Sequence, residues 1–267
     1  MFDFQNDAYA ALKKNIDNLF ATVPSANFDE GAKQAVLAAS APYVDFLARA
    51  VGVPAKDVRL VLRELSLDHR LFSLLREKLE KLAEYSQKGV RTGEIRVHTT
   101  TLYVIVRLLQ PKVIVETGVA NGKSSAFILR ALARNGRGEL CSIDLPTPQE
   151  TARDGDDGVL PTGQETGWLV PEFLRDRWVV RLGDARELLP QLKAKIGSID
   201  IFFHDSLHTY EHMTFELEHA KEWVRKGGLV LCDDIQDNEA FTNASRGLRR
   251  AAFGTFGVFH VSGRDGG

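Results

Sequence analysis

The stretch KVIVETGVANGKSS, residues 112–125, places a β-branched run and an acidic residue directly before a loop with two glycines and a helical pattern. The run from Lys112 to Glu116 predicts a strand, and the apolar spacing from Ser124 to Ala133 predicts a helix. Glycine permits a sharp turn and lets a ligand approach the backbone. The stretch therefore predicts a strand–loop–helix unit, with the loop from Glu116 to Gly122 as a candidate ligand site.

The same alternation continues through the C-terminal part of the chain. Helices are expected at 185–194, 212–224 and 238–252, and further strands at 140–144, 178–182, 199–203, 229–232 and 256–261. This alternation predicts the α/β class, a Rossmann-like and mostly parallel sheet with helices on both faces. Such sheets usually finish with an antiparallel pair of strands. Only 256–261 reads as a strand after the last helix, so the completion of that edge stays open.

The chain divides near residue 95 into two parts. Residues 1–94 show apolar residues at three- and four-residue spacing and predict an all-helical N-terminal region, in which Asp68 is placed to cap a helix starting near Leu71. Residues 95–267 form the predicted Rossmann-like domain. The apolar faces of the N-terminal helices must pack against something. A homo-oligomer interface and a cover over an acceptor pocket both satisfy this requirement.

One long segment, residues 146–174, stands outside the alternation. It is rich in Pro, Gly, Asp and Thr, and it begins at the carboxyl end of the second strand, where ligands bind in such sheets. A loop of this length inside a compact domain is usually functional or disordered. The segment is therefore a candidate lid, and an excursion without a role is the alternative.

The composition narrows the class of protein. Hydrophobic residues make up 44% of the 267 residues, which is enough for a sizeable core, and the formal net charge of -2 argues against a nucleic-acid partner held by a basic face. No stretch approaches the ~20 apolar residues of a membrane span, and the N-terminus lacks the pattern of a signal peptide. Cys141 and Cys232 lie in apolar runs, as buried thiols do in a reducing compartment. We expect a cytoplasmic protein without a membrane partner.

Three carboxylates lie at or just after the ends of the first three predicted strands of the sheet. The loop after Glu116 has neither the G-x-G-x-x-G spacing nor a complete P-loop, and its acidic lead suits a positively charged ligand better than a pyrophosphate; a tight structural turn is the alternative. Asp144 ends the second strand, where an acidic residue meets ribose hydroxyls; a helix cap or a solvated loop residue is the alternative. Asp184 follows the third strand, where a turn can close over a purine. Capping of the next helix by Asp184 is the alternative, and the two roles are compatible.

This order of motifs resembles class I S-adenosylmethionine-dependent methyltransferases. The later stretches FHDSLHTYE, residues 203–211, and GGLVLCDDI, residues 227–235, resemble the bacterial family grouped with macrocin O-methyltransferase and the cephalosporin hydroxylase-like proteins. The chain is similar, more distantly, to catechol O-methyltransferase. The resemblance covers roughly residues 95–261 and leaves out the N-terminal helices.

The resemblance implies an S-adenosylmethionine-dependent enzyme that methylates a hydroxyl of a small-molecule acceptor. The methionine part of S-adenosylmethionine is expected near the glycine loop, the ribose at the second strand, and the adenine beside the third and fourth strands. The residues expected to bind the cofactor are Glu116, Thr117, Gly118, Asn121, Gly122, Ser124, Ser125, Asp144, Asp184, Ala185, Asp205, Ser206 and Leu207.

The resemblance also implies a divalent metal, held by one carboxylate after the fourth strand and two adjacent residues after the fifth. The matching residues are Asp205, Asp233 and Asp234, and the catechol-type relatives carry Asn at the last of these positions. Three neighbouring carboxylates repel one another unless a cation or protons intervene. Oxygen ligands favour Mg²⁺, Ca²⁺ or Mn²⁺. Carboxylates spread apart without a metal are the alternative.

His208 stands where the catechol-type relatives use a lysine as base. A histidine titrates near neutral pH, and a hydroxyl polarised by a metal loses its proton more easily. His208 and Asp205 are therefore the expected catalytic residues, although His208 could also be a structural residue at a helix start. A nicotinamide-dependent oxidoreductase on the same fold and a non-catalytic S-adenosylmethionine-binding protein are the alternative functions.

Overall fold

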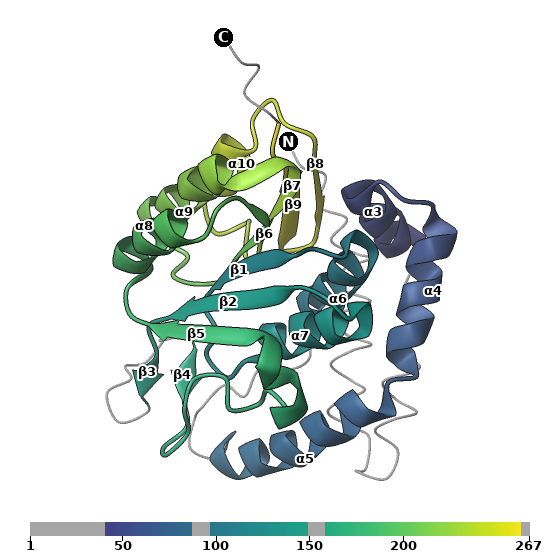
Figure 1. Cartoon of the computed structure of the whole chain (residues 1–267), viewed down its shortest axis with the longest axis vertical. Helices are drawn as coiled ribbons and strands as arrows, with labels where there is room; N and C mark the ends of the chain where they lie inside the picture. Colours follow the sequence, from purple (N-terminus) through teal and green to yellow (C-terminus); the bar gives the residue numbers. More distant parts are fainter. Residues whose placement is uncertain (1–40, 87–96, 149–157, 263–267) are drawn as a thin grey trace.

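The computed structural model describes residues 41–86, 97–148 and 158–262 (Figure 1). The helices predicted before residue 41 and the predicted boundary at residue 95 lie outside these ranges. In the described part, the Rossmann-like α/β fold is confirmed. Among the described helices, none is long and apolar enough to cross a membrane.

One seven-stranded sheet runs through the domain in the order β5-β2-β1-β6-β7-β9-β8. The first five strands in this order are parallel, and β9 and β8 are antiparallel to their neighbours. The strands are β1 (Val113–Thr117), β2 (Glu139–Asp144), β5 (Trp178–Leu182), β6 (Ile199–His204), β7 (Val224–Cys232), β8 (Arg250–Phe253) and β9 (Phe256–His260).

Helices cover both faces of the sheet, and successive strand residues supply two separate cores (Figure 1). Ile114 points to the core beneath α3 to α7, whereas Val115 points to the core beneath α8, α9 and α10. The helices are α3 (Ala41–Val51), α4 (Ala55–Ser66), α5 (His69–Ser86), α6 (Val97–Leu109), α7 (Lys123–Asn135), α8 (Ala185–Lys195), α9 (Tyr210–Trp223) and α10 (Ala240–Ala244).

The described N-terminal helices pack onto the Rossmann-like domain itself. Tyr43 and Phe46 of α3 contact the ring of Phe253, with centroid separations of 5.2 and 5.8 Å. Asp68 accepts a hydrogen bond from the backbone N–H of Leu71, which confirms the predicted cap. The same carboxylate pairs with Arg130 of α7 at 2.5 Å. These apolar faces are therefore buried within one chain, and a homo-oligomer through this region stays a prediction.

The helix predicted at 238–252 is wrong in its second half. Helix α10 ends at Ala244, and Arg250–Phe253 forms β8, which pairs with β9. Gly254, with φ +58°, begins the two-residue turn that joins the two strands. The strand forms because Phe253 is buried against α3, a tertiary contact that outweighs the local helical spacing. This hairpin is the antiparallel pair that completes the edge of the sheet.

Strand β1 lies between β2 and β6, and the order of the parallel strands reverses direction there. In open α/β sheets, ligands bind outside the carboxyl ends of the strands at such a switch point. The residues that follow β1, β2, β6 and β7 all gather at this end of the sheet. The two short strands β3 (Thr147–Pro148) and β4 (Val159–Leu160), which pair with each other in the predicted lid, follow β2 there.

Candidate functional site

Two glycines shape the loop between β1 and α7. Gly118 and Gly122 have φ values of +81° and +85°, in the left-handed region that favours glycine. A Cβ added at Gly118 would lie 1.9 Å from the backbone oxygen of Asp205, and one at Gly122 would lie 2.7 Å from the Cα of Gly167. The loop is therefore enclosed between the end of β6 and the later part of the candidate lid.

Gly118→Ala is expected to destabilise the protein by more than the about 1–2 kcal/mol that a left-handed conformation alone costs a non-glycine residue. The excess arises because the new methyl group would overlap the backbone at Asp205. Gly136→Ala is the matched control, since Gly136 has φ +67° and no described atom within 4 Å of an added Cβ. Urea unfolding of both variants measures the difference, and equal losses would contradict the close approach of loop and strand.

Glu116 lies under the loop and is fully buried. Its carboxylate accepts hydrogen bonds from the hydroxyls of Ser124, Ser125 and Ser142 at 2.6–2.7 Å. Burial raises the pKa of Glu116, and these three hydroxyls oppose that shift. The predicted cofactor residues Glu116, Ser124 and Ser125 are thus brought together, but their side chains fasten the start of α7 to β1 and β2.

Asp144, at the end of β2, reaches across to the same loop. Its Oδ1 accepts hydrogen bonds from the backbone N–H groups of Val119 and Ala120 at 3.0 and 3.3 Å. Its Oδ2 accepts one from the hydroxyl of Thr166 at 2.9 Å. The sequence-based expectation that Asp144 and the glycine loop share one site agrees with this placement, and the Oδ2 atom faces the candidate lid.

The described end of the candidate lid lies directly on the glycine loop. The backbone N–H groups of Gly167 and Leu169 donate to the carbonyls of Ala120 and Asn121 at 2.8 and 3.0 Å. The indole N–H of Trp168 donates to Asn121 Oδ1 at 2.6 Å. The predicted cofactor residue Asn121 therefore holds the lid in this structure.

The four residues predicted around the adenine differ in their contacts and in their exposure. Asp184 caps α8 by accepting the backbone N–H of Arg186 at 2.7 Å, which is the alternative role named for it, and Ala185 is buried behind it. Ser206 donates its hydroxyl to Glu216 at 2.8 Å. Leu207 is 59% exposed after the end of β6.

Glu216 of α9 is a buried acceptor that sequence reasoning missed. Its carboxylate accepts the hydroxyls of Thr117 and Ser206 and lies 2.6 and 2.8 Å from ring nitrogens of His204 and His212. Burial would raise its pKa, but the neighbouring His204 and the hydrogen bonds hold the pKa of Glu216 well below its ordinary value. A carboxylate on the buried face of α9, among Met213, Leu217 and Ala220, is the signal that could have revealed it.

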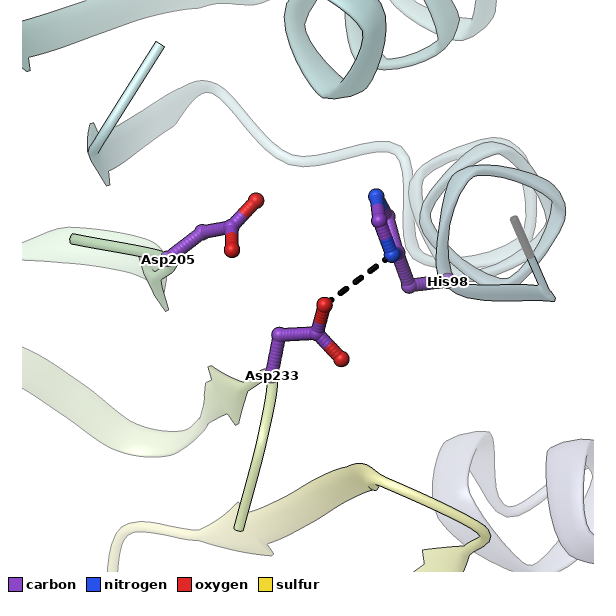
Figure 2. A group of neighbouring side chains, drawn as sticks. All are labelled: His98, Asp205 and Asp233. Carbon is purple, nitrogen blue, oxygen red and sulfur yellow. Dashed lines mark ion pairs between the residues drawn. The ribbon is translucent and has the colours of Figure 1, made fainter. Parts of the chain in front are cut away.

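Carboxylates from β6 and β7 meet a histidine from α6. His98, Asp205 and Asp233 each offer a ligand atom, and these atoms lie within 4.8 Å of one another. Figure 2 shows the three side chains pointing toward a common space, with His98 Nδ1 3.0 Å from Asp233 Oδ2. Asp233 is 1% exposed and His98 10% exposed. Sequence reasoning missed His98, a polar residue in the first turn of an apolar helix far from the other two in the chain.

Asp234 does not join Asp205 and Asp233 in this group. Adjacent residues at a strand end point to opposite sides, and Asp234 turns the chain away with φ +47°. It lies instead with His208 and Asp237, in the second of two potential metal groups in the described residues. The predicted trio of carboxylates is therefore divided between the two groups.

His208 is half-buried beside the ring of His204, with the ring centroids 5.2 Å apart. Burial lowers the pKa of His208, and the nearby His204 lowers it further. Its Nε2 lies 4.0 Å from Asp234 Oδ2 and has no hydrogen-bond partner among the described residues. A neutral imidazole with a vacant nitrogen is suited to accept a proton.

Residues 115–235 match a family model described as a methyltransferase domain. The chain carries a methyltransferase domain. The match begins in β1 and takes in the glycine loop, Asp144 and the carboxylates after β6 and β7. The interpretation of the chain as a methyltransferase is confirmed, and it is favoured over the nicotinamide-dependent alternative.

The methyltransferase is similar in fold to two solved structures. One is an O-methyltransferase from Bacillus cereus in complex with SAH, with 16% identity and a TM-score of 0.50 over 72% of this chain and 91% of that chain. The other is the O-methyltransferase TomG from Streptomyces achromogenes, involved in tomaymycin synthesis and in complex with SAM, with 17% identity and a TM-score of 0.51 over 76% of this chain and 96% of that chain. At these identities the likeness shows the fold alone. No curated protein matches the sequence.

The order of the sheet strands also differs from that of the dinucleotide-binding sheet. Numbered along the chain within the sheet, the strands lie in the order 3-2-1-4-5-7-6. The dinucleotide-binding sheet has the order 3-2-1-4-5-6, without an antiparallel strand inserted before the last one. Here β9 is that inserted strand.

Proposed function

We propose that this methyltransferase transfers the methyl group of S-adenosylmethionine to a hydroxyl of a small-molecule acceptor, with the help of a divalent cation. The observation that carries the proposal is the contact between the glycine loop, where the methyl donor would bind, and the carboxylates, where the methyl acceptor would bind. Gly118 of the glycine loop packs against the backbone of Asp205. The side chain of Asp205 belongs to the same group as His98 and Asp233. A methyl donor on the loop would therefore lie beside the carboxylates.

The backbone of the glycine loop and Asp144 are the proposed cofactor contacts. Asp144 Oδ2 is the atom available to a ribose hydroxyl, since Oδ1 already holds two N–H groups of the loop. Thr166 donates to the same Oδ2, so a bound ribose either shares this oxygen with the lid or displaces Thr166 from it. Asp184, Ala185, Ser206 and Leu207 would lie around the adenine.

Asp144→Asn is expected to lower the affinity for S-adenosylhomocysteine about 10- to 100-fold, because the variant loses a hydrogen bond from the ribose to a charged acceptor. The amide oxygen can keep the two loop contacts of Oδ1, whereas the amide nitrogen cannot accept from a hydroxyl. Isothermal titration calorimetry measures the affinity, with the exposed Asp176→Asn as the control for charge. An unchanged affinity in Asp144→Asn would place the ribose elsewhere.

The acceptor hydroxyl is proposed to lie between the carboxylates and His208. When bound, the cation would be held by Asp205 and Asp233 and would lower the pKa of the hydroxyl. The hydroxyl oxygen then attacks the methyl carbon, the carbon–sulfur bond breaks, and the proton passes to His208 Nε2. The products are a methyl ether and S-adenosylhomocysteine, and His208 returns the proton to solvent. Orientation of the two substrates contributes much of the acceleration.

Ligand binding tests the proposed function directly. S-adenosylmethionine is expected to raise the melting temperature of the full chain in a thermal-shift assay, whereas NADH and NADPH are not, because only ligands that bind the native state stabilise it. No binding of S-adenosylmethionine at millimolar concentration would overturn the proposal. Binding without methyl transfer to any of a panel of phenols, sugars and hydroxy acids would instead favour a non-catalytic cofactor-binding protein.

A further inference from the structure

The group formed by His98, Asp205 and Asp233 contains an imidazole as well as two carboxylates. His98 lies in the first turn of the apolar helix α6, Asp205 follows β6, and Asp233 follows β7, so three separate elements bring the donors together (Figure 2). The nitrogen and oxygen donors converge in a place where Asp233 is buried and His98 is nearly so. We propose that this site binds a divalent transition-metal ion with His98 as a direct ligand, in preference to Mg²⁺.

The spacing of the donors suits such an ion. Two ligand atoms at right angles, each about 2.1 Å from a metal, lie about 3.0 Å apart, and two opposite ones lie about 4.2 Å apart. His98 Nδ1 and Asp233 Oδ2 are 3.0 Å apart, and all three donors fall within 4.8 Å. An ion can therefore be held by all three residues with only small side-chain adjustments, and its remaining positions stay open to water or the acceptor.

The chemistry of the donors selects the ion. Mg²⁺ and Ca²⁺ prefer all-oxygen sites, whereas imidazole favours Zn²⁺, Fe²⁺, Co²⁺ and Ni²⁺, and Mn²⁺ accepts both kinds of ligand. Asp205 and Asp233 alone suit any divalent cation. His98 shifts the preference, so the sequence-based expectation of Mg²⁺, Ca²⁺ or Mn²⁺ rests on an incomplete set of ligands.

The surrounding structure fixes the ligands in place. Thr255 donates its hydroxyl to Asp233 Oδ1 at 3.1 Å, which leaves Oδ2 directed at His98. Helix α6 is anchored to the N-terminal helices by the hydrogen bond of 2.9 Å between Tyr43 and Thr101. Such supporting contacts orient metal ligands and strengthen binding. Helix α3 therefore supports the helix that supplies the nitrogen ligand.

The second potential metal group in the described residues is less suited to a metal. The side-chain amide of Gln236 donates to Asp234 Oδ1 and to Asp237 Oδ1 at 3.3 and 3.0 Å, and Asp237 is exposed. Water already solvates an exposed carboxylate well, so the carboxylate gains little free energy from binding an ion. This group supplies the matched control for the experiment.

Metal binding by the full chain tests the proposal, after chelator treatment and dialysis. Titration with Co²⁺ followed by visible absorption, and with Mg²⁺ by calorimetry, is expected to give one site with at least 10-fold higher affinity for Co²⁺. His98→Asn is expected to lower the Co²⁺ affinity at least about 10-fold, while Asp237→Asn and His219→Gln leave it unchanged. Equal affinities for Mg²⁺ and Co²⁺ would overturn the proposal, as would a His98→Asn variant that binds Co²⁺ normally.

A second measurement covers the case in which His98→Asn fails to fold. Mn²⁺ bound to the unaltered chain and to Asp237→Asn is expected to show nitrogen coupling in electron spin echo spectra, and its absence would overturn the proposal. The inference rests on the proposed function only in treating Asp205 and Asp233 as cation ligands. Calorimetry with S-adenosylhomocysteine separates the two: loss of cofactor binding with normal Co²⁺ binding would contradict the proposed function alone.

Discussion

Glu216→Ala is expected to lower the free energy of unfolding by about 3–5 kcal/mol, as the removal of one partner from a buried ionic network does. The carboxylate is fully buried, and four polar groups converge on it. Without it, the ring nitrogens of His204 and His212 and the hydroxyls of Thr117 and Ser206 lose their acceptor. Each buried donor left unsatisfied costs about 1–3 kcal/mol, less what repacking and water recover.

Glu218→Ala is the matched control for this prediction. Glu218 lies on the same helix, is 54% exposed and pairs with Lys221, so its loss should change stability by only about 0.5 kcal/mol. Urea unfolding of both variants by circular dichroism measures the two losses. A Glu216→Ala loss as small as that of Glu218→Ala would mean that the network contributes little to the native state.

The pH dependence of stability provides a further readout of the same network. The pKa of Glu216 is lower in the folded chain than its ordinary value of 4.5, so its ionised form stabilises the fold above that pH. This stabilisation is lost as the pH falls toward the folded pKa. The unaltered chain should therefore lose more stability between pH 5 and pH 3 than Glu216→Ala does.

Local sequence patterns were sufficient for most of the sheet. Parallel strands buried on both faces are continuous apolar runs, such as that from Ile201 to Phe203 in β6, and they can be recognised without tertiary information. The strand Arg250–Phe253 could not, because it carries helical spacing and becomes a strand only where Phe253 meets Tyr43 and Phe46. Local preference yields to packing at that edge of the sheet.

The site was less accessible to sequence reasoning than the fold, because chain proximity differs from proximity in space. Asp233 and Asp234 are adjacent in the chain, yet they belong to different groups. His98 precedes the first strand and still meets the carboxylates that follow the fourth and fifth. Glu116 was expected to face a ligand, but three serine hydroxyls surround its carboxylate. Only topology shows which polar side chains converge.

His208→Gln is expected to slow methyl transfer about 10²- to 10⁴-fold, the usual contribution of a general base. Glutamine keeps the polarity and approximate size of the side chain but cannot take the hydroxyl proton. The affinity of the variant for S-adenosylhomocysteine should stay within about 2-fold of that of the unaltered chain, because the imidazole is assigned no contact with the cofactor. Release of S-adenosylhomocysteine from the full chain, with an acceptor found by screening, measures the rate.

The control and the pH profile decide whether His208 acts as a base. His219→Gln removes a histidine elsewhere on α9, whose ring Nδ1 lies 2.9 Å from the carbonyl oxygen of Phe215, and this variant should keep the full rate. Because burial lowers the pKa of His208 below 6.5, the neutral imidazole persists to lower pH than in a free histidine. The acidic limb of kcat/KM should therefore lie below pH 6.5 and disappear in His208→Gln. A variant that is slow but keeps this limb would assign the proton transfer to another group and leave His208 a positioning role.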